Sequence, residues 1–190
     1  MKTLFLCLGM LLPTLAARAD YFDDTGYRRL AVMLGAAIPN GNGVAVSQIE
    51  FGNPAYLPEG GSGTFLGSGP NFLGKTFTVK GGSSGASGHA AAVASHFYGL
   101  NSDPALGRAS FTPGITQVDL YLVDAAETVN AWTAEAWLTP SSTAAPLPEL
   151  NAVQNHSWVD PSTFLRAFGD NDILRRFDFA IVRDGFLAVT

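Results

Sequence analysis

Residues Val44–Ile49 have the sequence VAVSQI, a short and mostly apolar run that is rich in β-branched side chains. A run of this kind is typical of a strand that is buried on both faces of a sheet. It follows the turn-forming segment Asn40–Gly43, in which Asn and Gly alternate. Similar runs recur, and we expect further strands at Lys75–Lys80, Val118–Val123, Ala152–Trp158 and Phe186–Thr190.

Segments with helical spacing of apolar residues lie between these strands. The segment Ser87–Leu100 begins with a Ser that can cap a helix and continues as an Ala-rich run. Because strand and helix alternate, the order predicts an α/β fold with a mostly parallel sheet and helices on both faces. The long Gly- and Pro-rich stretch Gly52–Gly74 predicts a surface loop. The other expected helices are Tyr27–Ala37, Glu127–Leu138 and Pro161–Asp184.

The composition favours a globular domain. The chain has 190 residues, of which 47% are hydrophobic and 14% are charged, and its net charge is -5. The apolar fraction excludes a disordered tail, and the acidic balance argues against a nucleic-acid binder, which needs basic groups for the phosphates. The single Cys excludes a small disulfide scaffold.

The first residues have the pattern of a secretory signal peptide. Lys2 gives a positive start, Leu4–Leu15 is an uncharged apolar run, and the tripeptide Ala17–Ala19 has small residues at the cleavage positions. The alternatives are a membrane anchor and a buried helix, but the run contains Pro13 and is shorter than the roughly 20 apolar residues of a membrane span. We therefore expect a cleaved signal over residues 1–19, and a secreted or periplasmic bacterial protein.

Several segments, in order along the chain, resemble the subtilisin-like serine peptidases, or subtilases. Gly43–Gly52 (GVAVSQIEFG) resembles the strand that delivers the triad aspartate, and Gly88–Ser95 (GHAAAVAS) resembles the start of the helix that carries the catalytic histidine. Phe111–Tyr121 is similar to the family's G-V-A-P-x-A-x-L-Y strand. Ala152–Trp158 is similar to the segment that forms a wall of the substrate cleft. Phe177–Val189 is similar to the helix and strand that precede the oxyanion asparagine. The resemblance implies a partial peptidase domain over 40–190, after an N-terminal segment 20–39, with a subtilisin-like three-layer fold that is incomplete at its C-terminus.

This resemblance implies two candidate catalytic residues, Glu50 and His89. Glu50 falls on the triad aspartate, with one methylene more. The alignment places Ala92 at the catalytic histidine and His89 on the first, non-catalytic histidine of the motif. We therefore expect that His89 could serve as the base only in a strained geometry. The family's serine motif does not occur in the chain, which is therefore predicted to be inactive. In a longer product with the serine, the implied reaction is amide hydrolysis through an acyl-enzyme, with Glu50 as the orienting carboxylate.

Simpler interpretations of these residues stay open. A carboxylate such as Glu50 is more often solvated or paired than catalytic. His89 and His96 would lie about 10 Å apart along a helix axis, too far to share an ion, so neither a metal nor a cofactor is predicted. His156 is expected to be structural.

A second hypothesis is a non-catalytic homologue that binds an extended peptide along the edge of Val118–Val123 or Ala152–Trp158. A third is an exported α/β domain without peptidase ancestry. The expected partner is a peptide or protein substrate, with no nucleic acid and no transmembrane segment after signal removal. The family interpretation requires Glu50 and the start of the Ser87–Leu100 helix to converge at one end of the sheet.

Overall fold

The computed structural model describes residues 21–51, 57–58, 70–80, 85–100, 110–123, 145–157 and 170–190. The predicted signal peptide and the predicted helix Glu127–Leu138 lie outside the described residues. None of the helices in these ranges is long and apolar enough to cross a membrane. The chain divides into two compact units between Ile38 and Pro39.

The first unit contains two short helices, α1 (Tyr21–Asp24) and α2 (Tyr27–Leu34), and a 3₁₀ turn, η1 (Gly35–Ala37). Gly26 joins the two helices with a φ of 72°, a left-handed conformation that glycine adopts without steric cost. The predicted helix at Tyr27–Ala37 is confirmed, with its last turn in 3₁₀ form. The helix α1 was not expected from the sequence.

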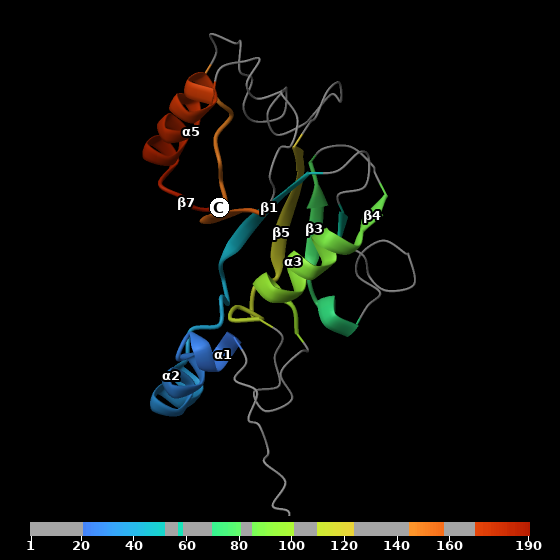
Figure 1. Ribbon diagram of the computed structural model, residues 1–190, viewed down its shortest axis with the longest axis vertical. Helices are drawn as coiled ribbons and strands as arrows, with labels where there is room; N and C mark the ends of the chain where they lie inside the picture. The colour runs from blue at the N-terminus through green and yellow to red at the C-terminus, as the bar shows by residue number, and fades with distance from the viewer. Residues whose placement is uncertain are drawn as a thin grey trace, which may run out of the picture. The chain divides into compact units, whose positions relative to one another are not determined.

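The second unit is built on a five-stranded sheet with the strand order β3-β5-β1-β6-β7 (Figure 1). Every neighbouring pair in this sheet runs parallel. The predicted α/β fold with a mostly parallel sheet is therefore confirmed, and each strand matches its predicted segment to within two residues. The strands are β1 (Ala45–Phe51), β3 (Thr76–Val79), β5 (Gln117–Val123), β6 (Val153–His156) and β7 (Leu187–Val189).

Two helices of the described chain cover opposite faces of this sheet, as predicted. These are α3 (Gly88–Tyr98) and α5 (Asp170–Asp184), the described part of the helix expected from Pro161. Successive side chains of a strand point to opposite faces, and on β5 Leu120 packs in one core cluster with Ala94 of α3. The next residue, Tyr121, packs in a second cluster with Ala180 of α5. The sheet therefore forms the middle of three layers.

A second, two-stranded parallel sheet was not expected from the sequence. It pairs β2 (Leu57–Pro58), which lies within the predicted loop Gly52–Gly74, with β4 (Ala86–Ser87). A 3₁₀ turn, η2 (Pro70–Phe72), also lies in that stretch. Since β4 leads directly into α3, the small sheet helps to fix where α3 begins.

The turn before β1 packs closely against the segment that precedes β5. Gly41 has a φ of 80°, and a Cβ added to it would lie 2.7 Å from Cγ1 of Ile115. The backbone N–H of Gly114 donates to the carbonyl oxygen of Asn40 at 2.7 Å. These contacts hold the first residues of β1 and β5 in register.

The strand order corrects one prediction about the edges of the sheet. β5 lies between β3 and β1, and β6 lies between β1 and β7, so both are paired on each side. β5 and β6 are therefore interior strands and not the edge strands that the peptide-binding hypothesis expected, while peptide binding itself stays a prediction. In the described sheet the edge strands are β3 and β7.

Candidate functional site

Glu50 lies at the carboxyl end of β1, and its side chain is only 1% exposed. Residues Val46, Gln48 and Glu50 alternate along the strand onto the face that α3 covers. Burial disfavours the charged carboxylate and raises the pKa of Glu50, while hydrogen bonds from Gln48 and His89 act in the opposite direction. A carboxylate in this position is stabilised only through its partners.

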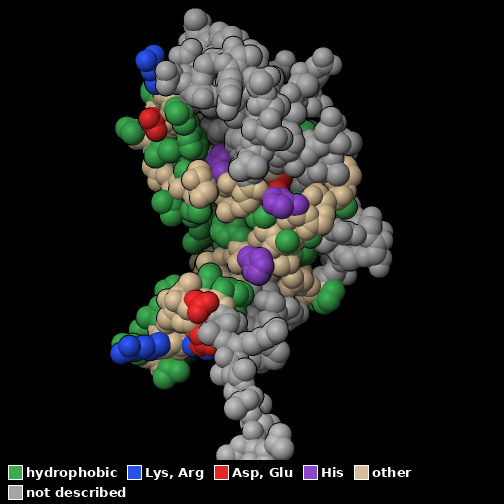
Figure 2. Space-filling view, viewed as in Figure 1, with side chains coloured by type: hydrophobic (Ala, Val, Ile, Leu, Met, Phe, Trp, Pro, Cys, Tyr) green, Lys and Arg blue, Asp and Glu red, His purple; other side chains and the backbone are tan. Residues whose placement is uncertain are grey.

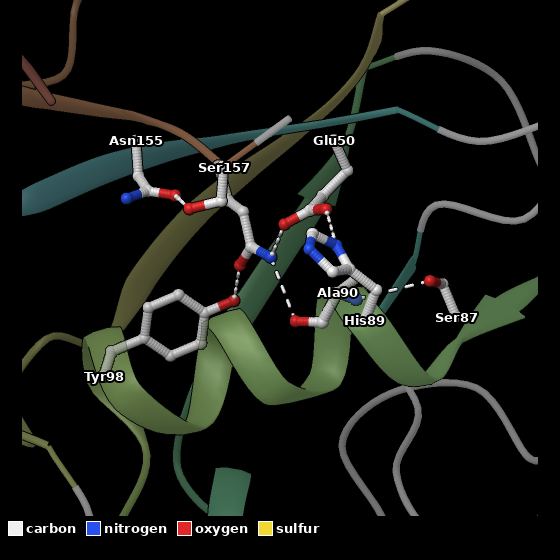
Figure 3. Close-up of polar contacts among 8 residues, drawn as sticks. Glu50, Ser87, His89, Ala90, Tyr98, Asn155 and Ser157 are labelled. Atoms are coloured by element: carbon white, nitrogen blue, oxygen red, sulfur yellow. Dashed lines mark hydrogen bonds and ion pairs between the residues drawn. The ribbon is translucent and has the colours of Figure 1, made fainter. Parts of the chain in front are cut away.

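His89 reaches Glu50 from the first turn of α3 (Figure 3). Its Nδ1 lies 2.8 Å from Oε2 of Glu50, while the side chain is 62% exposed. Among the residues that the structure describes, none is hydrogen-bonded to Nε2 of His89. When Glu50 is ionised it can only accept, so a neutral imidazole at His89 carries its proton on Nδ1 and a lone pair on Nε2. This is the arrangement in which a carboxylate orients an imidazole as a base.

The start of α3 determines which residue meets Glu50. Ser87 caps the helix, its Oγ accepting a hydrogen bond from the backbone N–H of Ala90 at 3.3 Å, as predicted for a helix that begins at Ser87. Ala92 lies one turn further along and is exposed. His89 contacts Glu50 at an ordinary hydrogen-bond distance. The two predicted catalytic residues therefore meet, and their catalytic role stays a prediction.

Sequence reasoning missed two further buried side chains, Gln48, which contacts Glu50, and Tyr98, which contacts Gln48. The Nε2 of Gln48 donates to Oε1 of Glu50 at 2.7 Å and to the carbonyl oxygen of Ala90 at 3.0 Å. The hydroxyl of Tyr98, at the end of α3, donates to Oε1 of Gln48 at 2.5 Å. A sequence signal for Gln48 exists, because it is a polar residue in an otherwise apolar strand, two positions before Glu50 on the same face.

The end of β6 lies beside the end of β1. Asn155 pairs with Gln48 and His156 with Ile49, so the register continued by one residue places Ser157 alongside Glu50. The Oγ of Ser157 donates to Oδ1 of Asn155 at 2.8 Å, and Figure 3 shows both residues to the left of the Glu50–His89 pair. The resemblance to the subtilases assigns this segment to the wall of the cleft. Its last residue, Trp158, lies outside the described residues.

A separate buried polar cluster lies on the face that α5 covers. Glu149 accepts hydrogen bonds from Ser47 at 3.2 Å and from Gln154, and Oε1 of Gln154 lies 3.0 Å from Nε2 of His156. Burial lowers the pKa of His156 to about 4, and its ring meets the edge of Phe177 at 5.1 Å between centroids. The cluster joins the segment before β6 to β1, in agreement with the structural role expected for His156.

The described surface carries few charged groups near the site. On the face shown in Figure 2, histidine side chains lie at the surface, and no continuous stripe of Lys and Arg crosses the coloured residues of the sheet unit. Within the described ranges, no three His, Cys, Asp or Glu side chains are grouped as a metal site. Glu50 and His89 offer hydrogen bonding and acid–base chemistry in this region.

Comparison with protein-family models, with curated proteins and with solved structures finds no match for this chain. The fold and the site define an α/β protein that carries a buried carboxylate and an exposed imidazole at the carboxyl edge of a parallel sheet.

Proposed function

We propose that this protein is an exported homologue of the subtilisin-like serine peptidases in which Glu50 orients His89 as the base. The observation that carries the proposal is the 2.8 Å contact between Nδ1 of His89 and Oε2 of Glu50. The two residues come from a strand end and from the first turn of a helix on one face of the sheet, as the resemblance requires. Asn155 and Ser157, next to this pair, supply polar groups for a substrate backbone.

The proposed role of the pair is proton transfer. In a peptidase of this class, a serine Oγ attacks the scissile carbonyl and its proton passes to Nε2 of the imidazole, while the carboxylate stabilises the imidazolium. The same proton then goes to the leaving amine, and water hydrolyses the acyl-enzyme. Glu50 and His89 are placed for the carboxylate and imidazole parts of this sequence.

We further propose that residues 1–190 alone do not cleave peptide bonds. A nucleophile must lie within hydrogen-bond reach of its base. In the part of the chain that the structure describes, no Ser or Thr hydroxyl is hydrogen-bonded to Nε2 of His89. The hydroxyl of Ser157 is directed to Asn155. An oriented imidazole without such a serine retains only weak chemistry of its own, toward activated acyl groups.

Hydrolysis of p-nitrophenyl acetate by the full chain measures that chemistry. We expect slow hydrolysis that falls to the background rate in His89→Gln and is unchanged in His96→Gln, a matched exposed histidine on the same helix. A fluorophosphonate probe should form no serine adduct. Equal rates for wild type and His89→Gln would contradict the role of His89, and a serine adduct would contradict the predicted inactivity.

The alternative function is a non-catalytic peptide-binding domain. The edge strand β7 favours it, because Leu187 is 62% exposed and Val189 is 43% exposed there. An extended peptide adds a strand at such an edge through backbone hydrogen bonds. A mixture of unstructured peptides should then shift the backbone NMR signals of Leu187 and Val189. This alternative is preferred if that shift is seen and His89→Gln leaves ester hydrolysis unchanged.

A further inference from the structure

We propose that Gln48 and Tyr98 are positioning residues that set the geometry of the Glu50–His89 pair. Gln48 lies within the Gly43–Gly52 motif, where the subtilase resemblance assigns it no role, and Tyr98 lies after the Gly88–Ser95 motif. Neither residue is hydrogen-bonded to the exposed ring of His89. The inference uses the proposed role of His89 for one of its readouts, the ester hydrolysis, whereas its other readout, the position of the imidazole proton, is independent of any activity.

Gln48 joins the two elements that the pair comes from. Its Nε2 donates one hydrogen to Glu50, on its own strand, at 2.7 Å and the other to the carbonyl oxygen of Ala90, in the first turn of α3, at 3.0 Å. Ala90 follows His89 directly in the chain. One buried amide group therefore fixes the carboxylate relative to the turn that carries the imidazole, and a shift of either element would break one of these bonds.

Tyr98 fixes the orientation of that amide. Its hydroxyl donates to Oε1 of Gln48, which can only accept, so the NH₂ group is held toward Glu50 and Ala90. The ring is fully buried, and burial raises the pKa of the Tyr98 hydroxyl, which keeps it protonated as a donor. A flipped amide would place its oxygen against the Glu50 carboxylate, with two acceptors in contact.

The hydrogen bonds run from Tyr98 to Gln48, from Gln48 to Glu50 and from Glu50 to His89, so substitutions at Gln48 and Tyr98 have different effects. Without the amide, Oε1 of Glu50 is buried with no donor, and the carboxylate is less favourable relative to its protonated form. A protonated or displaced Glu50 no longer holds the proton on Nδ1 of His89. The loss of the Tyr98 hydroxyl is milder, because both donor contacts of Gln48 stay in place.

The test compares Gln48→Met with Gln154→Met in the full chain. Met has nearly the shape of Gln without its polar groups, and Gln154 is an equally buried glutamine of the same sheet on the opposite face. In ¹⁵N-histidine-labelled protein, we expect Gln48→Met to move the His89 ring signals from the Nδ1–H form toward a mixture of both tautomers. Gln154→Met should leave them unchanged.

The rate of ester hydrolysis should follow the same order. We expect a fall of about tenfold for Gln48→Met, within the range that oriented acid–base groups contribute, and a smaller fall for Tyr98→Phe. If Gln48→Met does not fold, Tyr98→Phe carries the test, because it removes a single hydroxyl from a well-packed ring.

Two results would overturn the proposal. One is a wild-type His89 tautomer in a folded Gln48→Met or Tyr98→Phe protein. The other is an equal change in Gln154→Met, which would indicate general loosening of the sheet. If Gln48→Met shifts the tautomer while His89→Gln does not affect ester hydrolysis, the positioning role stands and the proposed function fails.

Discussion

Nδ1 of His89 lies 2.8 Å from Oε2 of Glu50, and the two residues are 39 positions apart in the chain. One is among the most buried side chains of the protein, and the other is 62% exposed. A buried carboxylate therefore holds one nitrogen of an imidazole whose ring is largely open to solvent. Burying the ionised carboxylate of Glu50 is unfavourable, and its effect on the free energy of unfolding can be measured.

Glu50→Gln tests the cost of the buried carboxylate. Burial raises the pKa of Glu50 in the folded state above its unfolded value, so its contribution to stability is largest at low pH and is lost as the pH rises through the folded pKa. The amide does not titrate. We therefore expect the free energy of unfolding of Glu50→Gln, relative to wild type, to increase as the pH rises above 4.5, measured by urea unfolding across this range. A difference that is constant with pH would contradict the raised pKa.

His156 should make the protein sensitive to acid. Its pKa is about 4 in the folded protein and 6.5 for an unperturbed histidine, so the unfolded chain takes up a proton first as the pH falls. Stability should fall between pH 6.5 and about 4, by on the order of 3 kcal/mol. His156→Gln should flatten this part of the pH profile. A profile that His156→Gln leaves unchanged would mean that another group titrates.

The cap at Ser87 should support both the helix and the site. Ser87→Ala removes the side-chain oxygen that accepts from the backbone N–H of Ala90, and loss of such a cap costs about 1 kcal/mol. Because His89 lies in the turn that this bond closes, we also expect slower ester hydrolysis. Ser87→Thr keeps an acceptor oxygen and should retain most of the stability and the rate. Thermal unfolding and the ester assay, applied to both variants, check these expectations.

Gly41 and Gly43 form a matched pair for the turn before β1. Both have a left-handed backbone, with φ of 80° and 78°, so a Cβ is strained at either position. At Gly41 it would also lie 2.7 Å from Ile115, whereas nothing lies within 4 Å at Gly43. Gly41→Ala should therefore destabilise the protein more than Gly43→Ala, by about 1–3 kcal/mol for the added overpacking. Equal losses in chemical denaturation would argue against this close contact.

The sequence predicted the fold better than it predicted the site. Apolar runs such as Val118–Val123 and the Ser cap at residue 87 are local signals, and the structure has β5 and α3 where they indicate. The sheet of β2 and β4 was missed because each strand has only two residues and a pattern cannot show so short a pairing. The order of strands in space has no local signal either, which is why β5 and β6 were wrongly expected at an edge.

For the site, the sequence indicated both Glu50 and His89 but not how they meet. Aligning the Val93-Ala94 pair with the family motif placed Ala92 at the base, whereas the contact depends on where α3 begins and on its distance from β1. Gln48 and Tyr98 could not be assigned, because their hydrogen bond joins residues 50 positions apart and depends on the packing of α3 on the sheet.

The position of the ring proton on His89 tests the central claim most directly. In ¹⁵N-histidine-labelled wild type, an ionised Glu50 should hold the proton on Nδ1, with Nε2 bearing the lone pair. In Glu50→Gln, the new amide should use its oxygen to accept from Gln48 and its NH₂ to donate to Nδ1 of His89, so the proton should move to Nε2. We predict this reversal of tautomer between the two proteins. The same Nε2-protonated form in both would contradict the account.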